Sequence, residues 1–166
     1  MFNSKQYWND RYEKGNNSDT GYAIPIIICG FPHSGTTILQ SIIGHIDEVD
    51  VIIKETDYIN PERLNNNKHK FVLAKTPYLK DKLFTKKYDN YIKIIIARNP
   101  CYIYSSLNKR FNYDIREDHT LQPHYMNFIK RIDNLIKEEN KNIHVIFYEE
   151  LFSNNFRKLK QIFNTI

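Results

Sequence analysis

The chain has 166 residues, a formal net charge of +5, 41% hydrophobic residues and 26% charged residues. That length fits one domain with a substantial apolar core, and the composition excludes a disordered, collagen-like or Pro/Gly-rich chain. The positive charge fits an anionic ligand. Lys and Arg are scattered along the chain, however, and form only short clusters such as Lys86-Lys87 and Lys130-Arg131. The Lys130-Arg131 pair is expected on a solvated helix face. This scatter disfavours nucleic acid as the partner.

The elements follow one another in a regular alternation after a polar N-terminal arm, residues 1–20. Residues 21–166 are predicted to form a single domain. Continuous apolar runs indicate strands buried on both faces, and apolar positions three and four apart indicate helices. In chain order we expect strand 24–29, loop 30–35, helix 36–46, strand 51–53, a loop with a weak helical turn over 61–70, strand 71–74, helix 79–88, strand 91–97, helix 100–111, loop 112–120, helix 121–139, strand 143–147 and helix 155–163. This alternation predicts an α/β fold with a central parallel sheet of about five strands and helices on both faces.

The cysteines, the histidines and the hydropathy of the sequence further limit the class of protein. Cys29 and Cys101 are too few for a disulfide framework, and both are expected to be buried free thiols at the ends of apolar runs. The histidines have no metal-ligand spacing, so no metal is expected. No secretory signal follows Met1 and no apolar run is long enough to span a membrane, which predicts a cytoplasmic protein with no membrane partner.

A glycine-containing loop, Gly30 to Thr37, follows the first strand and opens the first helix. This context gathers backbone N–H groups and the positive end of the helix at one point, which favours a phosphate or sulfate ligand. Gly30 and Gly35 have the spacing of a Walker A loop, but Thr36 stands where that loop requires lysine. A small-molecule P-loop kinase is therefore a disfavoured alternative. The alternative without any ligand is a tight strand-to-helix turn in which the glycines serve only the backbone conformation.

The segment Gly30-Phe31-Pro32-His33-Ser34-Gly35-Thr36-Thr37-Ile38-Leu39 resembles the 5′-phosphosulfate loop of sulfotransferases. These enzymes use 3′-phosphoadenosine-5′-phosphosulfate (PAPS) as sulfuryl donor and release 3′,5′-adenosine bisphosphate (PAP). The resemblance implies a P-loop-like three-layer fold, with the donor's 5′ end bound by Pro32, His33, Ser34, Gly35, Thr36 and Thr37. His33 is the main departure, because the family carries Lys or Arg there. A neutral histidine supplies less charge and would donate one hydrogen bond to the bridging oxygen, or act when protonated.

The segment Ile94-Ile95-Ile96-Ala97-Arg98-Asn99-Pro100 resembles the strand ending in Arg-Asp-Pro at which the family's 3′-phosphate site begins. The family pairs that arginine with a serine eight residues later, and Ser106 stands at this position. The resemblance thus implies that Arg98 and Ser106 bind the 3′-phosphate, a role that suits the forked guanidinium. Ser105 is an adjacent competitor. Asn99 replaces the usual aspartate, which removes one charge and a loop-bracing interaction.

Two further segments bear on catalysis. Phe71–Pro77 resembles the Lys-Thr-Pro segment of tyrosylprotein-type sulfotransferases and implies that Lys75 stabilises charge on the leaving phosphate or the sulfuryl group. Glu55 stands where those members place a catalytic glutamate and is the implied base for the acceptor hydroxyl, with Asp57 as the alternative carboxylate. Val145–Leu151 resembles a late strand followed by Tyr-Glu-x-Leu, whose implied role is structural.

Taken together, the resemblances imply an enzyme, a sulfotransferase that moves a sulfuryl group from PAPS to a hydroxyl acceptor of unidentified structure. Its implied catalytic residues are Glu55, His33 and Lys75, and its partners are the nucleotide donor and the acceptor. Many cytosolic members carry a C-terminal segment that closes over the nucleotide, and this sequence lacks its motif. That difference and His33 keep open a second possibility, a catalytically degenerate nucleotide- or anion-binding module of the same fold.

Overall fold

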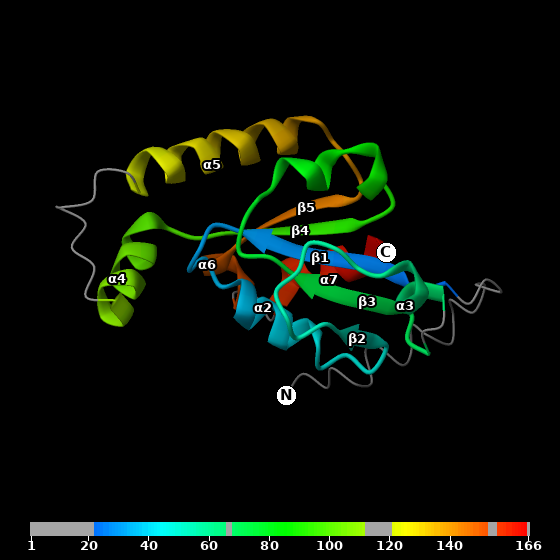
Figure 1. Ribbon diagram of the computed structural model, residues 1–166. Helices are drawn as coiled ribbons and strands as arrows, with labels where there is room; N and C mark the ends of the chain where they lie inside the picture. The colour runs from blue at the N-terminus through cyan, green and yellow to red at the C-terminus, as the bar shows by residue number, and fades with distance from the viewer. Residues whose placement is uncertain (1–21, 66–67, 112–120, 153–155, 166) are drawn as a thin grey trace.

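A computed structural model describes residues 22–65, 68–111, 121–152 and 156–165. Five strands form one parallel sheet in the order β2-β3-β1-β4-β5 (Figure 1). They are β1 (Ile24–Gly30), β2 (Val49–Val51), β3 (Phe71–Lys75), β4 (Ile92–Ala97) and β5 (Ile143–Phe147). The predicted α/β fold with a central parallel sheet of five strands is confirmed.

Helices cover both faces of the sheet, which explains why β3 and β4 are buried at every position and are largely apolar. One face packs against α3 (Pro61–Asn65), α4 (Pro100–Phe111) and α5 (Leu121–Lys137). The other packs against α2 (Thr36–Ile43), α6 (Tyr148–Leu151) and α7 (Arg157–Thr165). Figure 1 shows α5 on one side of the sheet and α2 on the other. The three-layer arrangement predicted from the alternation of elements is therefore present.

Several element boundaries differ from the prediction. The first helix ends at Ile43 and not at residue 46, because Gly44 caps it with its N–H donating to the Gln40 carbonyl. The second strand is Val49–Val51 and not 51–53, and Ile53 is 87% exposed. The expected helix 79–88 is wrong. Two 3₁₀ turns, η1 (Asp81–Phe84) and η2 (Lys86–Tyr88), stand there, separated by an extended Thr85.

The boundaries of the later elements differ less from the predicted ones. Helix α5 ends at Lys137 and not at 139, and the final helix runs from Arg157 to Thr165 and not from 155 to 163. The short helix α6 was not predicted, because four residues are too few to show a helical period. The N-terminal arm, residues 1–20, and the loop 112–120 lie outside the described residues.

Two surface predictions are wrong. Cys101 is exposed on α4, whereas Cys29 is buried as expected. Arg131 does not decorate a solvated face, because its guanidinium donates to the Leu79 carbonyl at 2.6 Å and pairs with Asp81 at 2.7 Å. Among the described residues, no helix is long and apolar enough to cross a membrane, and no group of His, Cys, Asp and Glu has the arrangement of a metal site.

Candidate functional site

The carboxyl ends of β1 and β4 form the centre of the candidate site. The two strands are neighbours in the sheet, and β1 ends at Gly30 while β4 ends at Ala97. The chain that leaves β1 enters α2 on one face, whereas the chain that leaves β4 enters α4 on the other face. The connections therefore part at this point, which is where open parallel sheets bind their ligands.

The loop between β1 and α2 depends on two glycines. A Cβ at Gly30 would lie 2.5 Å from the Ile96 carbonyl oxygen and 2.6 Å from Ser34 Oγ. Gly35 has φ +106°, which strains any other residue, and it stands at the N-cap of α2 without a side-chain cap. The first N–H groups of α2 are therefore left to a ligand or to water.

Two buried side-chain polar atoms among the described residues make no hydrogen bond, and both belong to residues that were predicted to bind the donor. They are Ser34 Oγ in the loop and Arg98 Nε just after β4. Leaving such a group unpaired costs about 1–3 kcal/mol, and an anion bound between the loop and Arg98 would supply acceptors for both. The residues present thus fit an anionic ligand.

Arg98 lies against the loop, as it must if the two bind opposite ends of one nucleotide. Its Nη1 donates to the His33 carbonyl oxygen at 3.2 Å. The guanidinium carbon lies 4.2 Å from the ring centroid of Tyr148 and 5.7 Å from that of Tyr102. The Arg98 carbonyl accepts a hydrogen bond from the Tyr125 hydroxyl at 2.7 Å. These contacts hold the guanidinium at the junction of β4 and the loop.

Ser106, on α4, lies close to the same loop. Its Oγ lies 3.3 Å from His33 Nδ1, whereas Ser105 is exposed. Burial first, and then the positive charges of Arg110 and Arg98, hold the pKa of His33 below its ordinary value. The imidazole is therefore neutral at pH 7, and this position lacks the cation that the resemblance would place there.

Lys75 and Glu55 form the second half of the site. Lys75 is buried at the end of β3, and its Nζ donates to Thr37 Oγ1 at 2.8 Å and to Glu55 Oε1 at 2.9 Å. The Glu55 side chain is 53% exposed, so it is accessible to an acceptor. The structure therefore brings the implied base and the implied cation into direct contact beside the first turn of α2.

Asp57, the alternative carboxylate, has other partners. It is buried and pairs with Lys80 at 2.6 Å and with Lys82 at 2.8 Å. Burial alone raises the pKa of Asp57, but its hydrogen bonds to the two lysines hold the pKa below the ordinary value. A carboxylate held in this way is a weak proton acceptor, which disfavours Asp57 as the base.

The Tyr-Glu-x-Leu segment makes contacts that the sequence did not predict. Two Tyr148 ring carbons lie 2.5 and 2.8 Å from where a Cβ on Gly35 would stand, so this ring packs on the loop as well as on Arg98. Glu149 accepts a hydrogen bond from the Asn99 N–H at 2.9 Å. Asn99 Oδ1 accepts one from the Cys101 N–H at 2.9 Å. Asparagine in place of aspartate therefore still braces the start of α4.

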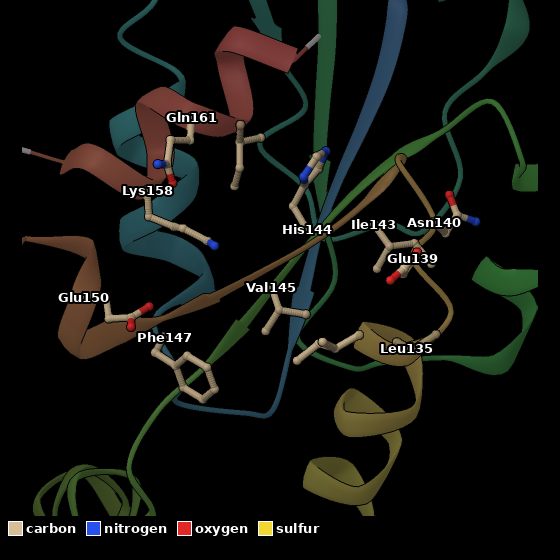
Figure 2. A pocket seen from close by; sticks show the side chains of 12 residues that line it. Leu135, Glu139, Asn140, Ile143, His144, Val145, Phe147, Glu150, Lys158 and Gln161 are labelled. Carbon is tan, nitrogen blue, oxygen red and sulfur yellow. The ribbon is translucent and has the colours of Figure 1, made fainter.

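A separate hollow of about 430 Å³ lies along β5, one of the two edge strands of the sheet (Figure 2). Its walls come from the end of α5 and from α7, and Figure 2 shows His144, Lys158 and Glu150 among the side chains that line it. None of the predicted site residues lines this hollow. The candidate site therefore stays at the loop, where the unpaired buried donors and the cations converge.

Comparison with known proteins supports the fold. Neither a family model nor a curated protein matches the chain. A solved structure of mouse sulfotransferase SULT7A1 complexed with PAP matches with a TM-score of 0.57 and 17% identity, over 85% of this chain and 57% of that chain. Retinol dehydratase in complex with androsterone and inactive cofactor PAP matches with a TM-score of 0.54 and 14% identity, over 86% of this chain and 59% of that chain.

This chain has the sulfotransferase fold. It spans less than two thirds of the length of either neighbour. At this level of identity, the likeness shows the fold alone.

Proposed function

We propose that this protein is a sulfotransferase that moves a sulfuryl group from PAPS to a hydroxyl acceptor. The observation that carries the proposal is the contact between Arg98 and the loop, where the guanidinium Nη1 lies 3.2 Å from the His33 carbonyl oxygen. Two groups suited to phosphate, a turn of N–H groups and an arginine fork, therefore lie close enough for one nucleotide. That both structural neighbours were solved with PAP supports the same ligand class.

The loop and the arginine divide the donor between them in this proposal. Residues 32–37 bind the 5′ end through backbone N–H groups and the hydroxyls of Ser34, Thr36 and Thr37. Arg98 and Ser106 bind the 3′-phosphate. The bound donor supplies an activated sulfuryl group. The unpaired Ser34 Oγ and Arg98 Nε support this assignment, because both gain a partner when an anion is present.

Glu55, Lys75 and His33 supply the proton transfer and the charge stabilisation. Glu55 accepts the proton of the acceptor hydroxyl, and its half-exposed carboxylate leaves room for that acceptor. Lys75 Nζ, held by Thr37 and Glu55, places a positive charge beside the start of α2, where it stabilises the leaving phosphate. His33 contributes one hydrogen bond.

Calorimetry with PAP tests the donor site. We expect Arg98→Ala to lower the affinity for PAP roughly 30- to 1000-fold, since a hydrogen-bonded charged contact is worth about 2–4 kcal/mol. Arg63→Ala is the matched control, because Arg63 pairs with Asp50 near the opposite end of the strands. Equal affinities of the wild type and Arg98→Ala would remove the 3′-phosphate assignment.

A second function is favoured by one observation. The neutral His33 leaves the position of a family cation uncharged, which suits a module that binds the nucleotide without turnover. An assay of sulfuryl transfer from radiolabelled PAPS to a panel of alcohols, phenols and sugars distinguishes the enzyme from the binding module. Tight binding of PAP with no transfer to any acceptor would support the binding module and contradict the enzyme.

A further inference from the structure

The contact between His33 and Ser106 restricts what Ser106 can do for a phosphate. A serine hydroxyl has a single proton. If His33 Nδ1 is unprotonated, that proton is donated to the ring across the 3.3 Å contact, and the serine presents only lone pairs to an anion. If Nδ1 carries a proton, the ring donates to Ser106 Oγ, and the hydroxyl proton is free to point at a phosphate oxygen. The presence or absence of a proton on Nδ1 therefore sets the direction of the Ser106 hydroxyl. A neutral ring carries its single proton on Nδ1 or on Nε2, whereas the imidazolium carries one on each, so protonation of the ring fixes Nδ1 as the donor.

The charges around His33 make protonation depend on the ligand. Arg98, at the end of β4, donates to the His33 carbonyl, and Arg110 lies on α4, the helix that carries Ser106. Both are cations, and together with burial they disfavour a third positive charge on the ring. A phosphate dianion that binds Arg98 and Ser106 reverses the sign of the local field, because it adds two negative charges next to the imidazole.

We propose that His33 takes up one proton from solvent when the nucleotide binds, and that the imidazolium then donates from Nδ1 to Ser106, turning the serine hydroxyl toward the 3′-phosphate. The inference rests on the proposed function, because it requires a nucleotide phosphate at Arg98 and Ser106. It makes His33 a positioning residue for Ser106. It also gives this protein a proton-linked donor site, which a permanent Lys or Arg at this position would not provide.

Calorimetric titration with PAP between about pH 6 and pH 8.5, in pairs of buffers with different ionisation enthalpies, measures affinity and proton uptake together. The phosphates of PAP themselves titrate near pH 6, so the informative quantity is the difference between the wild type and His33→Asn. Asparagine is the chosen replacement because His33 has φ +65°, a backbone conformation that asparagine tolerates well. His45→Asn, on an exposed histidine beyond α2, is the matched control.

We expect the wild type to take up more protons per PAP than His33→Asn, by up to one. Its affinity relative to that variant should rise as pH falls, by at most about tenfold per pH unit, because the bound state then holds more protons. His45→Asn should behave as the wild type. His33→Lys should bind PAP without the additional proton uptake.

One outcome would contradict the role of His33 alone, and another would contradict the nucleotide site as well. If the wild type and His33→Asn take up the same number of protons and change affinity in parallel, His33 is not the proton acceptor, although the nucleotide site stands. If the wild type binds no PAP at any pH, the proposed function fails together with this inference. His33→Gln repeats the comparison, and thermal unfolding of each variant shows that the proteins compared are folded.

Discussion

At the scale of single residues, the side chains assigned to chemistry are each held by more than one element. Lys75 leaves β3 but bonds to Thr37 on α2 and to Glu55 beyond β2. Arg98 leaves β4 but contacts the loop and a ring that follows β5. Such cross-bracing keeps a charged group in place before its ligand arrives, which is what pre-organised electrostatic stabilisation requires.

Glu55→Gln tests the assigned base. Because the amide cannot accept the acceptor proton, we expect sulfuryl transfer to fall roughly 100- to 10,000-fold. The affinity for PAP should stay within a few-fold of the wild type, since Glu55 makes no contact with the donor in the proposal. Steady-state transfer assays and calorimetry measure the two quantities. Glu62→Gln, at an exposed position on α3, is the control. Unchanged transfer would remove Glu55 from the scheme.

The two cysteines should differ sharply in reactivity. Burial raises the pKa of the Cys29 thiol to about 12, whereas Cys101 is exposed on α4. At about pH 8 a thiol reagent should therefore modify one cysteine quickly in the folded protein and the second only after unfolding. Cys101→Ser should abolish the fast reaction. Two fast thiols in the wild type would show that the packing around Cys29 opens readily.

At the scale of elements, the start of α2 depends on a contact from the other end of the chain. Gly35 has φ +106°, and the Tyr148 ring fills the space that a side chain at this position would need. The backbone conformation and the ring therefore exclude larger residues for separate reasons. The left-handed backbone conformation would strain any larger residue within the loop, and the Tyr148 ring would collide with its side chain.

Gly35→Ala should lower the free energy of unfolding by about 2–4 kcal/mol, the range for a strained left-handed residue with an added collision. Urea denaturation measures this loss. In a Tyr148→Ala background the same substitution should cost less, because the collision is removed and only the strain remains. Ser41→Ala, on the exposed face of α2, is the control. Equal costs in the two backgrounds would show that the ring does not restrict position 35.

Elements with a strong local pattern could be predicted from the sequence, and those shaped by distant contacts could not. Strand β4 and helix α4 follow from an isoleucine run and from a proline at the helix start. The expected helix 79–88 failed because Thr85 is extended and Lys80 and Lys82 bind Asp57. The spacing of Arg98 and Ser106 was visible in the sequence. The ring of Tyr148 on that arginine was not, since no local pattern encodes a contact between two strand ends.

At the scale of the whole molecule, the two halves of the candidate site belong to different strands of one sheet. The pairing of β1 with β4 fixes the distance between the loop and Arg98, so a ligand that bridges them adds to the stability of the sheet. PAP at 100 times its dissociation constant should raise the free energy of unfolding by about 2.7 kcal/mol. Urea denaturation at matched PAP concentrations should show a much smaller gain for Arg98→Ala. A gain of the same size would place the ligand elsewhere.

The position of Tyr148 also bears on the order in which the molecule is assembled. The loop after β1 is synthesised early, but the ring that packs on Gly35 and Arg98 follows β5, which is the last strand among the described residues and lies at one edge of the sheet. During synthesis, the loop after β1 therefore emerges long before the Tyr148 ring that packs on it. In the proposed function, tight binding of PAP requires that β5 has paired with β4 and that Tyr148 packs on Arg98, so binding of PAP would serve as a readout of the completed sheet.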